Sequence, residues 1–567
     1  MIFDVSEGQN IFDIEQALEL AAEHYNAQRI SEARSNYQNI LRADPNEPTA
    51  LHHLGLIAHQ DGRNDIALEL IAKATTIQPD RAETHYDLGV VCQELRRLED
   101  AKASYKKCLT ISPDNAGAHN NLGVVLRDLG NFEDAVKSCR NAIDIQPNYA
   151  AAHSNLGLAY QDLGKLDDAL RSFEEALRIT QDTAEIHYNH GNVLQKLGRL
   201  KKSIDSYEAA LHINPLLPDA NTNLGLVLRD LGKLGEAQNR YYKALEINPN
   251  LAEARHNLGM LQLSIGDMQQ GWKNYEWRWK IWPRNAHPSV SNKPLWEGDD
   301  LKGRTIYIYP EQGLGDSICF VRYLPLLKQF GCRVIFETPT SLASLFHHSQ
   351  IADHLIKPGE TPPDFDCHAS LLDLPQHLKT TVETIPDVTP YLRAPEKLKQ
   401  KWKLRFGEAK TFRLGIAWAG NSNLRQDHFR SATVEMFLPL AEIPNIALYS
   451  LQVGPKVDAT ELLRNKITDC GPHLTDFAQT AAAISQLDLI VSVDTSVAHI
   501  AGALGRPTWT LLHLSPDWRW MYRGKTTPWY PTMQLFRQTE LGQWKDVFQA
   551  VTAELINLAD LNDKLSN

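Results

Sequence analysis

A glycine recurs every 34 residues through the first half of this chain. The positions are Gly55, Gly89, Gly123, Gly157, Gly191, Gly225 and Gly259. A fixed period of this length is typical of stacked helix-turn-helix units, in which each unit buries its apolar face against the next. Such a stack offers an extended concave surface, so the first half is expected to hold a partner. Any chemistry is then expected in the second half.

Other positions of each unit keep the same period. A small residue follows most of these glycines after twelve positions and a larger one four positions later, as in Ala101 with Tyr105 and Ala169 with Phe173. Small residues let two helices approach closely, and a proline closes five of the units. These residues resemble the tetratricopeptide repeat. The resemblance implies an all-α superhelix of seven to eight repeats over residues 1–283.

Asparagines form a second ladder two residues before five of the glycines. They are Asn121, Asn155, Asn189, Asn223 and Asn257. A carboxamide donates and accepts hydrogen bonds, so it can pair with the backbone of an extended acceptor peptide without reading its sequence. Asparagine here can equally bond within its own unit, and both interpretations stay open. Four histidines stand four residues before glycines of the period. We expect them to pack or to be solvated, because a 34-residue spacing suits no single metal site.

Composition narrows the class of protein. A chain of 567 residues is long enough for several domains, and its net charge of −11 argues against nucleic acid as the main partner. Seven scattered cysteines without a Cys-x-x-Cys pair suggest neither a zinc site nor a disulfide framework. A reducing compartment fits, and we expect a cytoplasmic protein. The start MIFDVSEGQN is unlike a signal peptide, and no apolar stretch reaches ~18 residues, so no membrane span is expected.

Short apolar runs alternate with helical stretches in the second half, which predicts parallel sheets covered by helices. One set of strands falls within 303–395 and another within 411–555, so we expect two lobes that face a cleft. Ligands of such sheets bind at the carboxyl ends of the strands. A Trp- and Pro-rich junction at 284–302 precedes them. Four tryptophans just before it are expected to bury the end of the repeats, with sugar stacking as the alternative: Trp272, Trp277, Trp279 and Trp282.

The first motif, EQGLGDS, directly follows the first predicted strand. Gly313 and Gly315 let the backbone turn tightly and approach a bound group, and a helix begins there with its positive end. Asp316 is expected to project from this turn into the cleft. Spacing alone leaves three roles for Asp316: helix cap, catalytic base or part of a dinucleotide site. The dinucleotide fingerprint is incomplete, because Ile318 stands where it requires a third glycine.

The second motif is the loop after the strand at 412–420. It begins with Asn421 and contains Arg430 and Ser431. A guanidinium at a strand end suits a diphosphate, since it donates paired hydrogen bonds. The alternative is a solvated polar loop in which Ser431 caps the next helix.

The third motif, SVDTSVAHIAGALGRP, runs from a buried strand into a helix. The turn Asp494-Thr495-Ser496 offers free backbone N–H groups at the helix start, which is a ready site for a phosphate. Asp494 can instead cap this helix. His499 lies one helical turn after Ser496, so it either faces the same ligand or lies in the core.

Together the three motifs resemble the heptosyltransferase-type family of GT-B glycosyltransferases, over roughly residues 300–550. Repeats followed by such a domain are similar in layout to the O-linked N-acetylglucosamine transferase, whose repeat superhelix holds the acceptor protein on an asparagine ladder. The resemblance implies two Rossmann-like lobes, a UDP-, GDP- or ADP-sugar donor on the second lobe, inversion at the anomeric carbon, and neither a cofactor nor a required metal.

The resemblance also implies roles for individual residues. Asp316 matches the catalytic base, and Arg430 falls near the basic residue that meets the donor phosphates. Further donor-binding candidates are Gly313, Gly315, Asn421, Ser431, Gln452, Asp494, Thr495, Ser496 and His499. The short first lobe disfavours a lipid acceptor and favours a Ser or Thr hydroxyl of a protein that the repeats deliver.

Three competing functions remain at this point. A glycan or lipid acceptor is the alternative within transferases. A repeat scaffold with an inactive transferase domain, and a dinucleotide-dependent oxidoreductase, are the alternatives from other classes.

Overall fold

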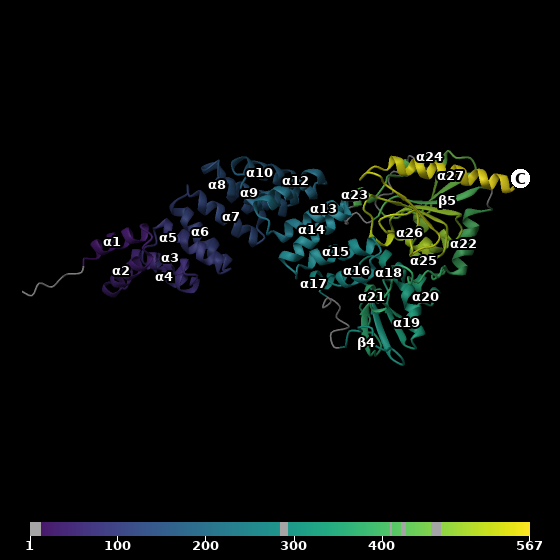
Figure 1. Ribbon diagram of the computed structural model, residues 1–567, viewed down its shortest axis with the longest axis horizontal. Coiled ribbons are helices and arrows are strands. Elements are labelled where there is room, and N and C mark those ends of the chain that lie inside the picture. The colour runs from purple at the N-terminus through teal and green to yellow at the C-terminus, as the bar shows by residue number, and fades with distance from the viewer. Residues whose placement is uncertain (1–12, 284–292, 409–410, 421–426, 455–465, 567) are drawn as a thin grey trace, which may run out of the picture. The chain divides into compact units, whose positions relative to one another are not determined.

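The structure is a computed structural model that describes residues 13–283, 293–408, 411–420, 427–454 and 466–566 (Figure 1). The chain divides into two compact units, Met1–Leu216 and Leu217–Asn567. The described part of the first unit is helical, whereas the second begins with further repeat helices and continues into two parallel sheets. The predicted class, an α-helical repeat region followed by α/β lobes, is confirmed.

The repeat helices pair in register with the 34-residue period. In the first unit the pairs are α1 (Ile14–Asn26) with α2 (Ile30–Ala43), α3 (Pro48–Gln60) with α4 (Asn64–Ile77), α5 (Ala82–Glu94) with α6 (Leu98–Ile111), α7 (Ala116–Asp128) with α8 (Phe132–Ile145), α9 (Ala150–Asp162) with α10 (Leu166–Ile179), and α11 (Ala184–Lys196) with α12 (Leu200–Ile213). In the second unit they are α13 (Pro218–Asp230) with α14 (Leu234–Ile247), and α15 (Ala252–Ser264) with α16 (Met268–Tyr275), before the short α17 (Arg278–Ile281).

The recurrent glycines lie where the two helices of a pair approach each other. A Cβ atom on Gly89 would lie 2.6 Å from the ring of Tyr105, and one on Gly191 would lie 2.7 Å from the ring of Tyr207. Because a side chain at these positions would overlap the ring of the second helix, close packing of the pair requires glycine. The sequence period is therefore a packing period.

The four periodic histidines hold the turns between repeats. Each makes a hydrogen bond through Nε2 to the backbone carbonyl six residues before it, at 2.9 to 3.1 Å. The residues are His85, His119, His153 and His187. The prediction that they pack agrees with these contacts.

The first lobe is a four-stranded parallel sheet in the order β3-β2-β1-β4. The strands are β1 (Thr305–Tyr309), β2 (Arg333–Glu337), β3 (His354–Ile356) and β4 (Cys367–Ser370). Side chains of α18 (Leu314–Phe320), α19 (Leu324–Gln329) and α20 (Ala343–Ser349) pack on one face of this sheet in the main core. The chain leaves β1 and enters α18 at the turn that carries the first motif.

The second lobe is a six-stranded parallel sheet in the order β10-β9-β8-β5-β6-β7. Its strands are β5 (Phe412–Ala417), β6 (Ile446–Ser450), β7 (Ile467–Asp469), β8 (Leu489–Val493), β9 (Thr508–Leu512) and β10 (Met533–Arg537). Figure 1 shows α24 (Leu438–Ala441) and α27 (Lys545–Ser566) on one side of it, and α25 (Phe477–Ile484) and α26 (Ser496–Ala503) on the other. This is the Rossmann strand order, whose topological switch point lies between β5 and β8.

The region before the first lobe packs through two of its tryptophans, as predicted. Trp272 is buried, donates from its indole N–H to the Thr380 carbonyl at 3.0 Å, and meets Trp518 edge-on with ring centroids 5.2 Å apart. Trp279 donates to the Asp373 carboxylate at 3.1 Å. The prediction was wrong for Trp282, which is 58% exposed. Part of the predicted junction, 284–292, lies outside the described residues, and the predicted domain bounds stay predictions.

Candidate active site

The first and third motifs lie at the switch points of the two sheets and meet each other. Asp316 is the third residue of α18, and its Oδ2 accepts the backbone N–H of Gly313 at 2.9 Å. Its Oδ1 accepts a charge-assisted hydrogen bond from Arg519, which comes from the second lobe. Asp316 therefore satisfies the start of its own helix and also joins the two lobes, so the predicted helix-capping contact is present.

Gly315 lets α18 and α26 approach closely. A Cβ atom on Gly315 would lie 2.8 Å from Cδ2 of His499 and 3.3 Å from its Nε2. The imidazole is held from its other side, where Nδ1 is 2.8 Å from the Tyr530 hydroxyl and the ring lies 5.1 Å from that of Trp520. His499 is thus a buried residue at the contact of the two lobes.

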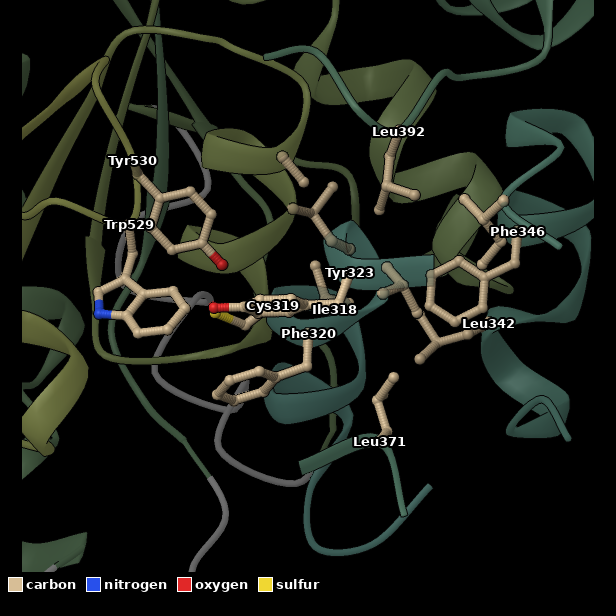
Figure 2. Close-up of a cluster of buried hydrophobic side chains, with 14 of the residues drawn as sticks. Ile318, Cys319, Phe320, Tyr323, Leu342, Phe346, Leu371, Leu392, Trp529 and Tyr530 are labelled. Atoms are coloured by element: carbon tan, nitrogen blue, oxygen red, sulfur yellow. The ribbon is translucent and has the colours of Figure 1, made fainter. Parts of the chain in front are cut away.

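Aromatic side chains continue this contact behind the motifs. Figure 2 shows Trp529 and Tyr530 of the second lobe facing Cys319 and Phe320 on α18. The rings of Phe320 and Trp529 meet edge-on at 5.4 Å. This buried layer fixes the position of α18, and with it Asp316, against the second sheet.

The turn after β8 begins α26. Thr495 is the N-cap residue, and its hydroxyl accepts the backbone N–H of Val497 at 3.3 Å. Thr495 therefore caps this helix. The alternative role of Asp494 as the helix cap is not seen. The Asp494 carboxylate lies 3.9 Å from Nε2 of His499. Ser496 is the first residue of this helix.

The turn after β5 brings Arg430 over the backbone. The Arg430 guanidinium packs directly on Gly420, and its Nε is buried without a hydrogen-bond partner. Asp427, at the start of α23 (Asp427–Arg430), accepts from the Ser431 hydroxyl at 2.8 Å. Ser431 therefore stabilises the turn. Asn421, a predicted donor-binding residue, lies outside the described residues.

Gln452, a predicted donor-binding residue, makes hydrogen bonds at the end of β5, and donor binding by it stays a prediction. Its Oε1 accepts the backbone N–H groups of Trp418 and Ala419 at 3.1 and 3.0 Å, and its Nε2 donates to the Ala419 carbonyl at 3.1 Å. The amide thereby ties the end of β5 to the end of β6. Through these contacts Gln452 holds the backbone in place beside the switch point.

A cavity of about 310 Å³ opens at this switch point. The second lobe contributes Arg430, Asp494, His513, Asp517 and their neighbours. Repeat helices α13, α14 and α15 supply the other wall. Its lining residues are Arg229, Leu234, Met260, Ser264, Arg430, Asp494, His513, Ser515, Pro516, Asp517, Trp518 and Tyr522. A volume of this size is at the small end of the range for ligand pockets.

The loop after β9 closes the cavity against the repeats. The Tyr522 hydroxyl donates to the Gly232 carbonyl at 2.5 Å, and the Tyr522 N–H donates to the Ser264 carbonyl at 2.8 Å. In the same loop Asp517 accepts from the Arg519 guanidinium at 2.6 Å. Asp517 and His513 are lining residues that the sequence analysis missed, because a single Asp or His after a strand has no distinguishing pattern.

Burial shifts the titration of the site. It raises the pKa of Asp316, against the opposing charge of Arg519, and it raises the pKa of Asp494, against that of Arg430. Burial lowers the pKa of His499 to about 3 and that of His513 to about 4. Both imidazoles are therefore neutral near pH 7, while both carboxyl groups titrate at higher pH than usual.

The asparagine ladder makes contacts between repeats in the first unit. The Asn121 amide donates to the Tyr86 hydroxyl at 3.2 Å, and the Asn155 amide donates to Oδ1 of Asn120 at 2.9 Å. Asn189, Asn223 and Asn257 are half-buried in the same register. These bonds occupy part of the hydrogen-bonding capacity of each amide, and peptide binding by the ladder stays a prediction.

Three further observations concern a dinucleotide site, a metal site and a membrane span. Glu337, the residue that a dinucleotide site would turn toward a ribose, is buried and accepts from the Tyr307 hydroxyl at 2.6 Å. In the described ranges no group of three or more His, Cys, Asp or Glu side chains could hold a metal ion. No helix within those ranges is long and apolar enough to cross a membrane.

Comparisons with known proteins match both halves of the chain. Models of the tetratricopeptide repeat match residues 46–114, 114–182, 154–218 and 225–266. The model of glycosyltransferase family 9 (heptosyltransferase) matches residues 458–547, which include Asp494, Thr495, Ser496 and His499.

Among individual proteins, the chain is similar to Protein FlbA of Caulobacter vibrioides (strain ATCC 19089 / CIP 103742 / CB 15). The two are 23% identical over 326 residues, which are 51% of this chain and 52% of the relative. The chain therefore spans about half the length of this curated relative.

Two solved structures resemble part of the chain. A crystal structure of MamA is 24% identical and covers 30% of this chain and 94% of its own, with a TM-score of 0.28. The structure of PilF from Pseudomonas aeruginosa is 22% identical and covers 37% and 95%, with a TM-score of 0.34. The family matches confirm the order of domains: this chain carries tetratricopeptide repeats followed by a glycosyltransferase domain of family 9, the heptosyltransferases.

Proposed function

We propose that this protein is an inverting, metal-independent glycosyltransferase that moves a sugar from a nucleotide sugar to a Ser or Thr hydroxyl of a protein held by the repeats. The observation that carries the proposal is the cavity at the second switch point, since one wall belongs to the transferase lobe and the other to the repeats. A donor bound there lies next to the surface on which the repeats would present an acceptor. We further expect a cytoplasmic location.

The acceptor hydroxyl loses its proton to Asp316 as its oxygen attacks the anomeric carbon. Burial raises the pKa of Asp316, which makes its carboxylate a stronger base near pH 7. The new glycosidic bond forms as the bond to the nucleoside diphosphate breaks on the opposite face of the sugar, and this inverts the anomeric centre. Arg519 keeps the carboxylate in place from the other lobe.

The leaving diphosphate gains negative charge in this step. Donors for that charge come from the Arg430 guanidinium and from the backbone N–H groups at the start of α26. The Nε of Arg430 is buried without a hydrogen-bond partner, 3.8 Å from the Asp427 carboxylate. These groups take the part that a metal ion plays in other transferases. Asp494, whose pKa burial raises, lies at the same strand end.

The experiment compares turnover of a panel of UDP-, GDP- and ADP-sugars by the wild type and by Asp316→Asn. Loss of a general base is typically worth ~10²–10⁴ in rate, so the variant is expected to lose activity by that factor. Asp353→Asn is the matched control. Asp353 also accepts a backbone N–H, from Val334 at 2.9 Å, and pairs with a cation, Lys328 at 3.1 Å, but both partners belong to the first lobe, whereas Asp316 pairs with Arg519 of the second lobe. Unchanged turnover in Asp316→Asn would remove Asp316 from this role.

A further inference from the structure

The cavity contains a guanidinium that belongs to the repeats and not to the transferase lobes. Arg229 lies near the end of α13, and its side chain is 17% exposed. It lines the cavity together with Arg430 of the second lobe. A terminal nitrogen of Arg229 donates to Asp230, its neighbour in sequence, at 3.2 Å.

The repeat register shows what is unusual about Arg229. Arg127 occupies the equivalent position three repeats earlier, within the nearly identical stretch LGVVLRDLG. Arg127 lies near two carboxylates, Asp128 at 3.5 Å and Asp162 of the following repeat at 3.7 Å. The counterpart of Asp128 is Asp230, but the counterpart of Asp162 is Ser264.

Ser264 replaces that second repeat carboxylate at the cavity wall, so the negative charge near Arg229 comes from Asp230 and, across the cavity, from Asp517 of the second lobe. Ser264 itself lines the cavity, and its hydroxyl donates to the Leu261 carbonyl at 2.6 Å. A guanidinium has five N–H donors in a planar fork that matches phosphate oxygens. Arg229 therefore lacks the second repeat carboxylate that Arg127 has, and it faces the cavity together with Arg430.

We propose that Arg229 binds the diphosphate of the donor together with Arg430, so that the repeats form part of the nucleotide-sugar site. This inference rests on the proposed function. Two guanidinium groups on different walls of one cavity can bind a diphosphate from two sides. One of them, Arg229, lies on a repeat helix that also carries a residue of the asparagine ladder. Donor binding and acceptor delivery then involve the same repeat helices, α13 and α15, which carry Asn223 and Asn257.

The experiment measures binding of UDP, GDP and ADP by titration calorimetry to the full chain and its variants. Arg229→Met is expected to bind the preferred nucleotide about ten- to a hundredfold more weakly, which is the range for a lost charge-assisted contact. Arg127→Met, the same change in the same local sequence, is expected to bind within about twofold of wild type. Arg229→Lys is expected to recover part of the affinity, since it keeps the charge but not the fork.

A second pair of variants keeps Arg229 in place. Ser264→Asp restores the carboxylate that Arg127 has, so it is expected to weaken nucleotide binding. Ser264→Asn adds nearly the same bulk without the charge, so it is expected to weaken binding less than Ser264→Asp. Equal affinity of wild type, Arg229→Met and Ser264→Asp would overturn the inference and leave the proposed function standing. An equal loss in Arg127→Met would overturn it too. A wild type that binds none of the three nucleotides would overturn the proposed function itself.

Discussion

Replacing Gly315 with alanine tests whether contact between α18 and α26 positions the carboxylate of Asp316, the proposed base. The new Cβ atom would lie 2.8 Å from Cδ2 of His499, about 0.6 Å short of ordinary van der Waals contact. His499 has little room to give way, because Tyr530 and Trp520 hold the ring from other sides. Overpacking of a filled core costs about 1–3 kcal/mol. We therefore expect a lower melting temperature.

Gly315→Ala is expected to lower the rate of turnover by more than the loss of folded protein alone would explain. If α18 moves to relieve the overlap, Asp316 moves with it, and a displacement of ~1 Å in a positioned group can cost about a hundredfold in rate. Thermal unfolding and donor turnover measure the two effects. Gly235→Ala is the control, because nothing lies within 4 Å of a Cβ at that position on α14. A Gly315→Ala protein with wild-type melting temperature and turnover would refute the reasoning.

Three other predictions follow from the packing and electrostatics. Gly191→Ala places a Cβ atom 2.7 Å from the Tyr207 ring, so we expect thermal unfolding to show destabilisation of about 1–3 kcal/mol; an unchanged melting temperature would contradict the packing explanation of the period. Burial lowers the pKa of His513 from 6.5 to about 4, so the unfolded chain binds the extra proton first as pH falls. The free energy of unfolding should therefore decline between about pH 6.5 and 4. Denaturant titrations should show a shallower decline in His513→Asn. Asn223→Ala with Asn257→Ala should reduce sugar transfer to a peptide while hydrolysis of the donor continues, and equal loss of both activities would argue against an acceptor role.

Much of the architecture could be predicted from local patterns. The glycine period predicted the repeats because the two helices of each unit pack in the same way, as the contact of Gly89 with Tyr105 shows. The apolar runs predicted eight of the ten strands that the structure describes. They missed β3 and β7, which have three residues each and are too short for a pattern.

The site was predictable only where one motif carries it. Asp316 and Asp494 follow predicted strands, and the switch points explain why they matter. The partners of Asp316 were not predictable, since Arg519 is 203 residues away and only folding brings the two together. The contacts of Gln452 were not predictable either, since its amide bonds three backbone groups at the end of β5, and donor binding by it stays a prediction. Arg229 has a local sequence almost identical to that of Arg127. The proposed role of Arg229 was therefore not predictable, because it depends on the cavity that the folded chain forms beside it.

The most direct test of the central claim follows the sugar to its acceptor. The full chain is incubated with its preferred nucleotide sugar and a library of Ser- and Thr-containing peptides, and intact mass spectrometry reads each peptide. We predict a gain of one sugar mass on a Ser or Thr peptide, with release of the nucleoside diphosphate, and no gain with Asp316→Asn. Transfer only to a glycan or lipid, or none to any peptide while the donor is consumed, would contradict the account.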